Sequence, residues 1–309
     1  MEQNTPTTEE DFKRLALREA GVVYSATAVF PLVISTLIGV VLLLAGAKDY
    51  SEADWFKYLG FLIPQLCFAG IAVFFFRKTR TPVQKVYGGC KWYYFIIALV
   101  LQFGLLFSLT ELNGYFVKLL TLMGYKPSES TLPSLDGWNL LPAILVIAVL
   151  PALFEETIFR GILSKQMHEN GWGLVPTVLI SGAMFSLFHH NPEQTLYQFV
   201  CGVCLTLVAI RAGSVLPTIC AHFVNNALIL ILEATGHGTL SDLPLGGYIS
   251  LIVVSALCLI GMLVYLVFFD KRGNRKGGVI RGKTFFLFSG IGIGVCAVYW
   301  LVVLIEGCL

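Results

Sequence analysis

Long apolar runs separated by short polar connections make up most of the sequence. A helix needs about 20 apolar residues to cross the ~30 Å hydrocarbon core of a bilayer, and runs of about this length recur along the chain. The pattern predicts an all-α fold, a polytopic membrane bundle of about eight to nine transmembrane helices. The fifth and sixth runs are short, and the lower number applies if one of them does not span. The predicted spans are Val22–Ala47, Trp55–Phe76, Trp92–Leu112, Leu140–Gln166, Val175–His190, Leu196–Arg211, Val215–Glu233, Gly246–Phe269 and Phe285–Ile305.

The distribution of polar residues divides the chain into four predicted parts. Residues 1–21 form a polar N-terminal segment without the basic start and cleavage site of a signal peptide, so we expect it to be retained as an interfacial segment. Residues 22–139 are accessory transmembrane helices, residues 140–233 are a core whose spans carry the polar motifs described below, and residues 234–309 are C-terminal transmembrane helices.

Composition and charge agree with a membrane protein. Hydrophobic residues make up 56% of the chain and charged residues only 13%, against about 25% charged residues in soluble domains. The net charge of +2 is small, and the basic residues gather in two connections, so no nucleic-acid partner is indicated. Lysine and arginine in short loops mark the cytoplasmic side. The connections that follow the second and eighth spans are therefore predicted to be cytoplasmic. Nine spans would then place the N-terminus in the cytoplasm and the C-terminus outside. The basic residues of these two connections are Arg77, Lys78, Arg80, Lys85, Lys91, Lys271, Arg272, Arg275, Lys276, Arg281 and Lys283.

Two adjacent glutamates interrupt the fourth span in the motif Glu155-Glu156-x-x-x-Arg160. A carboxylate in hydrocarbon costs roughly 2.5–3.5 kcal/mol even on lenient insertion scales, so the pair indicates a functional site. Glu156 and Arg160 are one helical turn apart and can pair, while Glu155 lies about 100° around the axis and can face another group.

Two later spans carry further polar motifs, Phe185-x-x-x-His189 and His222-x-x-x-Asn226. Counted from the cytoplasmic helix ends at ~1.5 Å per residue, Glu155 and His189 lie about 20 Å deep and His222 about 10 Å deep. The depths agree if the turn at 213–217 is recessed into the protein, which membrane proteins permit where the backbone lines a cavity.

These groups suit hydrolysis inside an apolar enclosure. A carboxylate can serve as general base, and imidazole and amide groups can stabilise a tetrahedral oxyanion. Alternatively, Glu155, His189 and His222 could hold a divalent metal such as zinc and leave one position for water. The zinc-peptidase motif His-Glu-x-x-His is absent from the sequence. The residues alone leave both options open, no cofactor or a divalent metal.

Taken together and in this order, the three motifs resemble those of the CAAX prenyl protease and bacteriocin-processing family of intramembrane endopeptidases, also called the CPBP or Abi family. The resemblance covers about Leu140–Glu233. It implies an endopeptidase in which Glu155 and His189 activate water and His222 and Asn226 stabilise the oxyanion. Glu156 and Arg160 would support this site. The implied partners are the lipid bilayer and a membrane-embedded or lipidated peptide substrate, and the short loops and compact length favour a bacterial plasma membrane.

Two alternatives come from other functional classes. One is a non-catalytic membrane protein that keeps the core for bacteriocin immunity or for binding. The other is an ion-coupled transporter, whose buried acids would carry ions. The sequence contains no two-fold repeat with matching broken helices, which is against transport.

Overall fold

The structure is a computed structural model that describes residues 8–127, 132–237, 243–274 and 282–309. Within these ranges every regular element is helical. The elements are α1 (Glu9–Leu44), η1 (Tyr50–Glu52), α2 (Asp54–Thr79), α3 (Gln84–Tyr87), α4 (Tyr93–Gly104), η2 (Leu105–Leu109), α5 (Thr110–Leu122), η3 (Gly137–Asn139), α6 (Leu140–Ala143), η4 (Ile144–Val149), α7 (Leu150–Glu156), η5 (Thr157–Ser164), α8 (Lys165–Glu169), α9 (Leu174–Phe188), η6 (Pro192–Gln194), α10 (Thr195–Ala212), α11 (Leu216–Ala234), α12 (Leu245–Val264), η8 (Tyr265–Phe269) and α13 (Gly282–Cys308).

Eight helical stretches among the described residues are long and apolar enough to cross a membrane. The prediction of an all-α polytopic bundle is confirmed, with the lower of the two helix numbers. Helix α9, the predicted fifth span, is apolar but has only 15 residues. A full crossing needs about 20 residues. The last turn of α9 ends inside the bundle, at His189.

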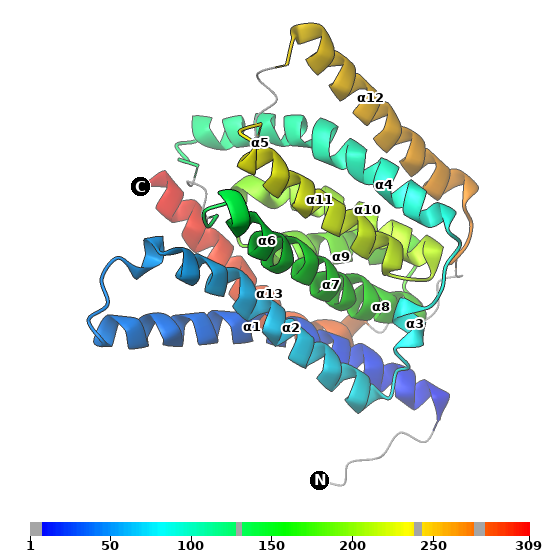
Figure 1. Ribbon diagram of the computed structural model, residues 1–309. Helices are drawn as coiled ribbons and strands as arrows, with labels where there is room; N and C mark the ends of the chain where they lie inside the picture. The colour runs from blue at the N-terminus through cyan, green and yellow to red at the C-terminus, as the bar shows by residue number, and fades with distance from the viewer. Residues whose placement is uncertain (1–7, 128–131, 238–242, 275–281) are drawn as a thin grey trace.

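The helices form three groups (Figure 1). Elements α6 to α11 form the centre of the bundle. Helices α1, α2 and α13 pack together on one side of this centre, with α1 lying along both α13 and α2. Helices α4 and α12 pack on the other side, where α4 also contacts α11. Side chains from both outer groups can therefore reach the central helices.

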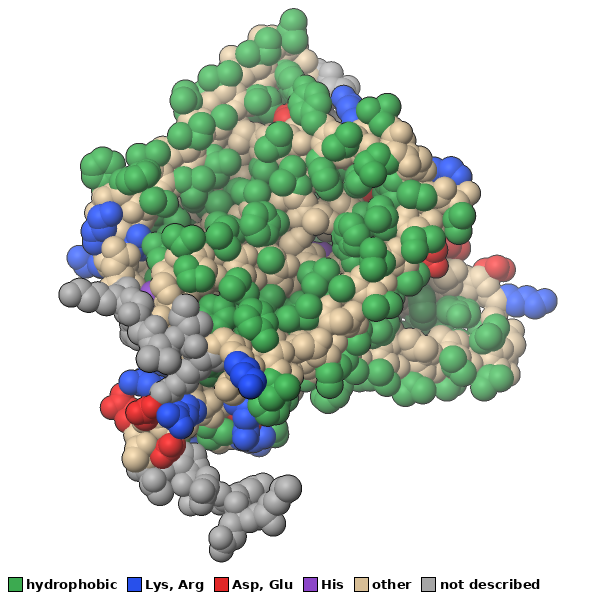
Figure 2. Space-filling model, turned by 180° about the vertical axis from the view of Figure 1, so that it is seen from behind, with side chains coloured by type: hydrophobic (Ala, Val, Ile, Leu, Met, Phe, Trp, Pro, Cys, Tyr) green, Lys and Arg blue, Asp and Glu red, His purple; other side chains and the backbone are tan. Residues whose placement is uncertain are grey.

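The surface is dominated by apolar side chains. Figure 2 shows hydrophobic groups across most of the visible face, with lysine, arginine and the acids gathered near its edges. Residues that a soluble protein would bury are exposed on the outer helices, including Leu37 (58%), Leu257 (65%) and Ile291 (69%). An apolar exterior of this extent is stable only in lipid, so the chain is an integral membrane protein.

Two boundaries differ from those predicted. Helix α1 runs without a break from Glu9, so the described part of the predicted N-terminal segment is the start of the first span rather than a separate element. A capping box between Thr8 and Asp11 fixes this beginning, because each side chain bonds the backbone N–H of the other residue. The third span continues through η2 and α5 to Leu122, ten residues beyond the predicted end at Leu112.

Helices α9 and α10 approach each other closely at two glycines. A Cβ on Gly202 would lie 2.7 Å from the Cα of Gly182, and one on Gly182 would lie 2.6 Å from a methyl carbon of Val203. Small residues permit such contact between membrane helices, where dispersion forces replace the hydrophobic effect. This contact positions His189 at the end of α9 relative to α10.

We predict that Gly202→Ala destabilises the protein by about 1–3 kcal/mol, because the added methyl group overpacks the α9–α10 contact. Gly70→Ala is the matched control, since it also lies within a helix but meets no atom within 4 Å. Thermal unfolding of the purified proteins in one detergent measures the difference. Equal melting temperatures for the two variants would contradict the proposed contact.

Candidate active site

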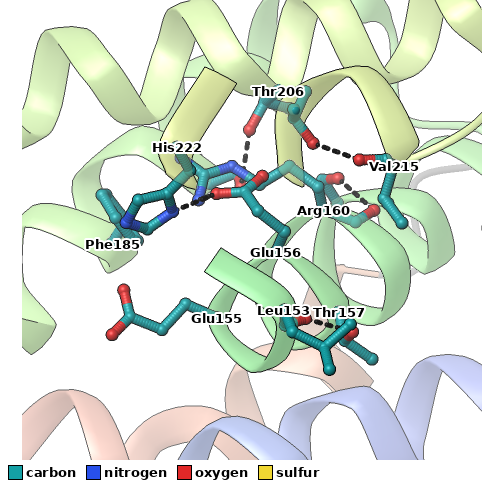
Figure 3. Close-up of polar contacts among 12 residues, drawn as sticks. Leu153, Glu155, Glu156, Thr157, Arg160, Phe185, Thr206, Val215 and His222 are labelled. Atoms are coloured by element: carbon teal, nitrogen blue, oxygen red, sulfur yellow. Dashed lines mark hydrogen bonds and ion pairs between the residues drawn. The ribbon is translucent and has the colours of Figure 1, made fainter. Parts of the chain in front are cut away.

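The two adjacent glutamates end helix α7 and point in different directions (Figure 3). Glu156 is completely buried, and Glu155 is 8% exposed. The chain then continues as a π-helical stretch, η5, whose wider turns are frequent at functional sites. One carboxylate therefore faces the interior of the protein while its neighbour faces a cavity.

Glu156 binds two cationic or potentially cationic groups. Its Oε1 lies 2.8 Å from Arg160 Nη1, which confirms the predicted pair, and 3.0 Å from His222 Nδ1. The Arg160 guanidinium also lies 4.2 Å from the centroid of the Phe185 ring. Because a carboxylate oxygen accepts, we assign the hydrogen to Nδ1 of His222. That assignment leaves Nε2 for the cavity that His222 lines.

His189 follows the last residue of α9 and is held by its own helix. Its Nδ1 lies 2.8 Å from the carbonyl oxygen of Phe185, which can only accept, so Nδ1 donates and Nε2 is the free nitrogen. The next residue, His190, has a left-handed backbone with φ of 53°, which is unusual for a residue other than glycine. The chain turns there toward η6 and leaves the His189 ring at the end of the helix.

Glu155 has a partner that the sequence did not suggest. The Gln65 side-chain amide, from helix α2, donates from Nε2 to Glu155 Oε1 at 3.2 Å. Gln65 is 4% exposed, and its Oε1 has no hydrogen-bond partner among the described residues. A buried amide oxygen without a partner is costly, so this oxygen is suited to accept from a water molecule or a substrate N–H group.

Asn226 belongs to a chain of amides. It donates from Nδ2 to the carbonyl oxygen of Ile147 at 3.1 Å, and its Oδ1 accepts from Asn225 Nδ2 at 3.1 Å. Asn225 Oδ1 in turn accepts from Gln102 Nε2 at 2.8 Å. The amide nitrogen of Asn226 carries a second hydrogen. The fixed amide can direct that hydrogen at a ligand.

These side chains line one cavity of about 380 Å³. Glu155, His189, His222 and Asn226 all contribute to its wall, so the structure brings the sequence-predicted residues of three motifs together. Glu156 and Arg160 lie behind the wall. The other lining residues are Gly60, Phe61, Pro64, Gln65, Gln102, Ile147, Pro151, Phe185, Phe188, Tyr197, Gln198, Cys201, Leu205 and Asn225.

The predicted depth problem at His222 is resolved by a recessed turn. Val215 and Ser214, between α10 and α11, are each 3% exposed, and the Val215 N–H donates to the carbonyl oxygen of Val86 in α3 at 3.1 Å. Helix α3 thus lies over the turn. The start of α11 is consequently deep enough for His222 to meet Glu156.

The side chains do not form a metal site in this arrangement. Among the residues that the structure describes, no three His, Cys, Asp or Glu side chains are close enough together to hold one ion. The alternative zinc set of Glu155, His189 and His222 is therefore not assembled, and the mechanism below uses no metal.

Comparison with known proteins agrees with the motifs. Residues 137–228 match the family model of Type II CAAX prenyl endopeptidase Rce1-like proteins. The matched segment runs from η3 into α11 and contains Glu155, Glu156, Arg160, His189, His222 and Asn226. The resemblance to the CAAX protease family is confirmed over this segment, and the match supports the general class of intramembrane CAAX-type proteases. No curated protein and no solved structure gives a significant match to the chain.

Sequence reasoning missed the two glutamines. Gln65 and Gln102 lie in apolar spans outside the matched segment. A glutamine in a membrane helix is a weak signal, but both residues face the protein interior rather than lipid. An inventory of every amide within the predicted spans would have included them.

We predict that Arg160→Met lowers the free energy of unfolding by about 3–5 kcal/mol, because it removes the permanent cation that pairs with the buried Glu156 carboxylate. The double variant Glu156→Gln, Arg160→Met should regain part of this loss, since it removes both charges. Thermal unfolding in detergent provides the comparison. A double variant less stable than Arg160→Met would show that the ion pair does not determine the effect.

Proposed function

We propose that this protein is an intramembrane endopeptidase that hydrolyses a peptide bond of a membrane-associated or lipidated peptide, in the plasma membrane of a bacterium. The observation that carries the proposal is the convergence of Glu155, His189, His222 and Asn226, from α7, α9 and α11, on one cavity. The match to the CAAX endopeptidase family model supports the same reaction class. Short loops and a compact chain favour the bacterial location.

In the proposed first step, a water molecule between Glu155 and His189 attacks the carbonyl carbon of the scissile bond. Glu155 accepts one proton of the water as general base, and the oxygen forms the new bond to carbon. Nε2 of His189, free of other partners, accepts a hydrogen bond from the same water. The carbonyl π electrons move to the oxygen and give a tetrahedral oxyanion.

The oxyanion is stabilised by groups held in place before the reaction. The second amide hydrogen of Asn226 is one donor, because the first bonds Ile147. Nε2 of His222 is the other. When this nitrogen also carries a hydrogen the ring is positive, and the Glu156 carboxylate 3.0 Å from Nδ1 balances that charge. Donors that need no rearrangement are worth most in a site with little water.

Collapse of the intermediate completes the reaction. The C–N bond breaks, its electron pair moves to nitrogen, and the proton held by Glu155 passes to the leaving amine. The immediate products are a carboxylic acid and an amine, and Glu155 is again ionised; the acid then gives its proton to the amine, which leaves a carboxylate and an ammonium group. In this mechanism Gln65 is a positioning residue, since its amide donates to Glu155 at 3.2 Å and limits the rotation of the carboxylate.

Glu155→Gln and His222→Ala are expected to reduce cleavage of membrane-embedded and prenylated peptides by about 10²–10⁴-fold, because each removes a proton acceptor or an oxyanion donor. Glu169→Gln is the matched control, since Glu169 lies further along the same helical stretch and pairs with Lys165 at 3.4 Å. Cleavage and the yield of folded protein are measured for each variant. Full activity in Glu155→Gln would refute the assigned base, and a folded wild type without activity would favour an immunity or binding role.

Gln65→Leu is expected to lower kcat by about 10- to 100-fold, the effect of one hydrogen bond to a charged group, with little change in KM. Gln198→Leu provides the comparison, because Gln198 lines the same cavity but bonds Gln194 at 3.2 Å instead of Glu155. A steady-state series with both variants tests the role. A loss confined to KM would assign Gln65 to substrate binding.

Cleavage is expected to survive removal of divalent ions, because the described side chains do not converge on one ion. Purified protein is dialysed against a chelator, its zinc content is measured, and its activity is compared with that of an untreated sample. Activity that is lost with zinc and restored by adding it would establish a metal site that this arrangement lacks.

A further inference from the structure

We propose that the substrate is an internal peptide bond of a membrane peptide that reaches the cavity from the face of the membrane opposite the basic loops, which is the extracytoplasmic face. The cleavage itself rests on the proposed function above. The side of access rests on separate observations, namely the charge of the two faces, the position of the cavity between them and the side chains that line it.

One end of the bundle, here called the basic face, is formed by the connections that follow α2, α8, α10 and η8. Hydrogen bonds join these connections to one another. Val215 bonds Val86, His168 Nε2 lies 2.6 Å from the carbonyl oxygen of Gly273, and Arg211 donates to the carbonyl oxygen of Arg272 at 2.7 Å. The basic residues of these connections and of the helix turns beside them are Arg77, Lys78, Arg80, Lys85, Lys91, Lys165, Arg211, Lys271 and Arg272, and they outnumber the acids Glu19, Glu169 and Asp270 that pair with three of them.

The other end of the bundle, here called the acidic face, is also tied together by hydrogen bonds. Ser134 N–H donates to Asp54 Oδ1 at 3.0 Å, Tyr125 donates its hydroxyl to Glu193 Oε1 at 3.2 Å, and the Lys126 N–H donates to the carbonyl oxygen of Gly307 at 2.7 Å. The lysines near this face are Lys48, Lys57, Lys118 and Lys126, which lie among Asp49, Glu52, Asp54, Asp136, Glu193, Glu233 and Glu306. The bias of lysine and arginine makes the basic face cytoplasmic.

The cavity extends from the middle of the bundle, where His222 and Asn225 line it, toward the acidic face along α2. Phe61 belongs to the second turn of α2, which begins at Asp54 on that face, and Tyr197 lies in the first turn of α10. Toward the basic face the cavity is closed by a layer of residues that are at most 2% exposed. This layer consists of Glu156, Thr157, Ile158, Phe159, Arg160, Ile162 and Ser164.

The connection between α9 and α10 is recessed below the acidic face. Trp300 donates from Nε1 to Thr195 Oγ1 at 2.8 Å, although α13 continues to Cys308, roughly 12 Å further along its axis. Asn113 donates to the carbonyl oxygen of Glu193 at 2.9 Å, while α5 continues to Leu122, roughly 13 Å further. The surrounding helices thus extend past His189 toward the acidic face, where Tyr125, 2% exposed, lies against Glu193.

A separate cavity of about 340 Å³ occupies the basic face. Lys85, Arg211 and Arg272 are among its lining residues, and none of the four proposed catalytic residues is. Arg160 and Ser164 line this basic cavity but not the catalytic cavity, and they belong to the buried stretch between the two. A cytoplasmic chain that entered this basic cavity would not reach Glu155.

The lining of the catalytic cavity favours an internal peptide bond. Among its lining residues there is no lysine and no arginine, and its polar members are mainly amides, histidines and Glu155. A free C-terminal carboxylate brought into this space would lack a fixed cation and would lie near Glu155, which is unfavourable for a buried charge. An internal segment adds only amide groups, which the glutamines and asparagines can bond.

Three reporter positions test the side of access without relying on activity. Cys308 is native and exposed at the end of α13, on the acidic face. Gly89→Cys places a thiol on the basic face, and Gly60→Cys places one at the catalytic cavity. Both glycines have room for the new side chain, because a Cβ at either position meets no atom within 4 Å. Intact cells are treated with a membrane-impermeant maleimide before and after permeabilisation, and labelling at each site is read by peptide mass spectrometry.

Cys308 and the Gly60→Cys thiol are expected to be labelled in intact cells, and the Gly89→Cys thiol only after permeabilisation. Labelling of Gly89→Cys in intact cells, or of Gly60→Cys only from inside, would overturn the proposed side of access. Because labelling needs no turnover, this result stands whether or not the protein cleaves peptides.

Right-side-out and inverted vesicles then test the internal bond. Each receives a membrane-impermeant fluorogenic peptide library blocked at both ends, or the same library with free C-terminal carboxylates. Cleavage of the blocked library in right-side-out vesicles alone is expected. Cleavage only of the free-carboxylate library, or only in inverted vesicles, would overturn the proposal. No cleavage by folded protein even in detergent would reject the proposed function instead, while the labelling still decides the orientation.

Discussion

The buried carboxylate of Glu156 is the constraint on which the site depends. A charge without access to water is costly unless it is paired and hydrogen-bonded, and Glu156 meets this need with Arg160 from its own helix and His222 from α11. The pairing fixes the height of α11 relative to α7. That height requires the recessed turn before α11, and helix α3 lies over this turn. The pairing with Glu156 also directs Nε2 of His222 at the cavity. Packing, local backbone and the orientation of one proposed catalytic group follow from one ion pair.

Hydropathy and helical spacing were sufficient to predict much of this arrangement from the sequence. Hydropathy identified the spans, and helical spacing paired Glu156 with Arg160 and directed Glu155 elsewhere. Counting residues along the helices also predicted the recessed turn that allows His222 to reach the glutamates. These results depend on contacts between neighbours in sequence or on the thickness of the bilayer, and both can be read from a single chain.

The features that the sequence did not predict depend on contacts between residues that are far apart in the chain. Gln65 is a single amide in an apolar span, and its partner Glu155 is 90 residues away, so no local pattern indicated the bond. Gln102 and Asn225 are separated by 123 residues. The early end of α9 also has no strong local signal, since its apolar residues continue almost to His189. The segment that matches the family model lacks α2 and α4, yet these helices supply Gln65 and Gln102. The accessory helices therefore contribute to the cavity as well as to the anchoring of the core.

The central claim is that Glu155 activates water rather than attacking the peptide itself. A single turnover in H₂¹⁸O with excess enzyme, followed by mass spectrometry of the product and of the Glu155 peptide, tests this claim directly. Our mechanism predicts one ¹⁸O atom in the new carboxylate of the product and none in Glu155. Transfer of ¹⁶O from the enzyme to the product, with ¹⁸O appearing in Glu155, would contradict it and establish the glutamate as a nucleophile.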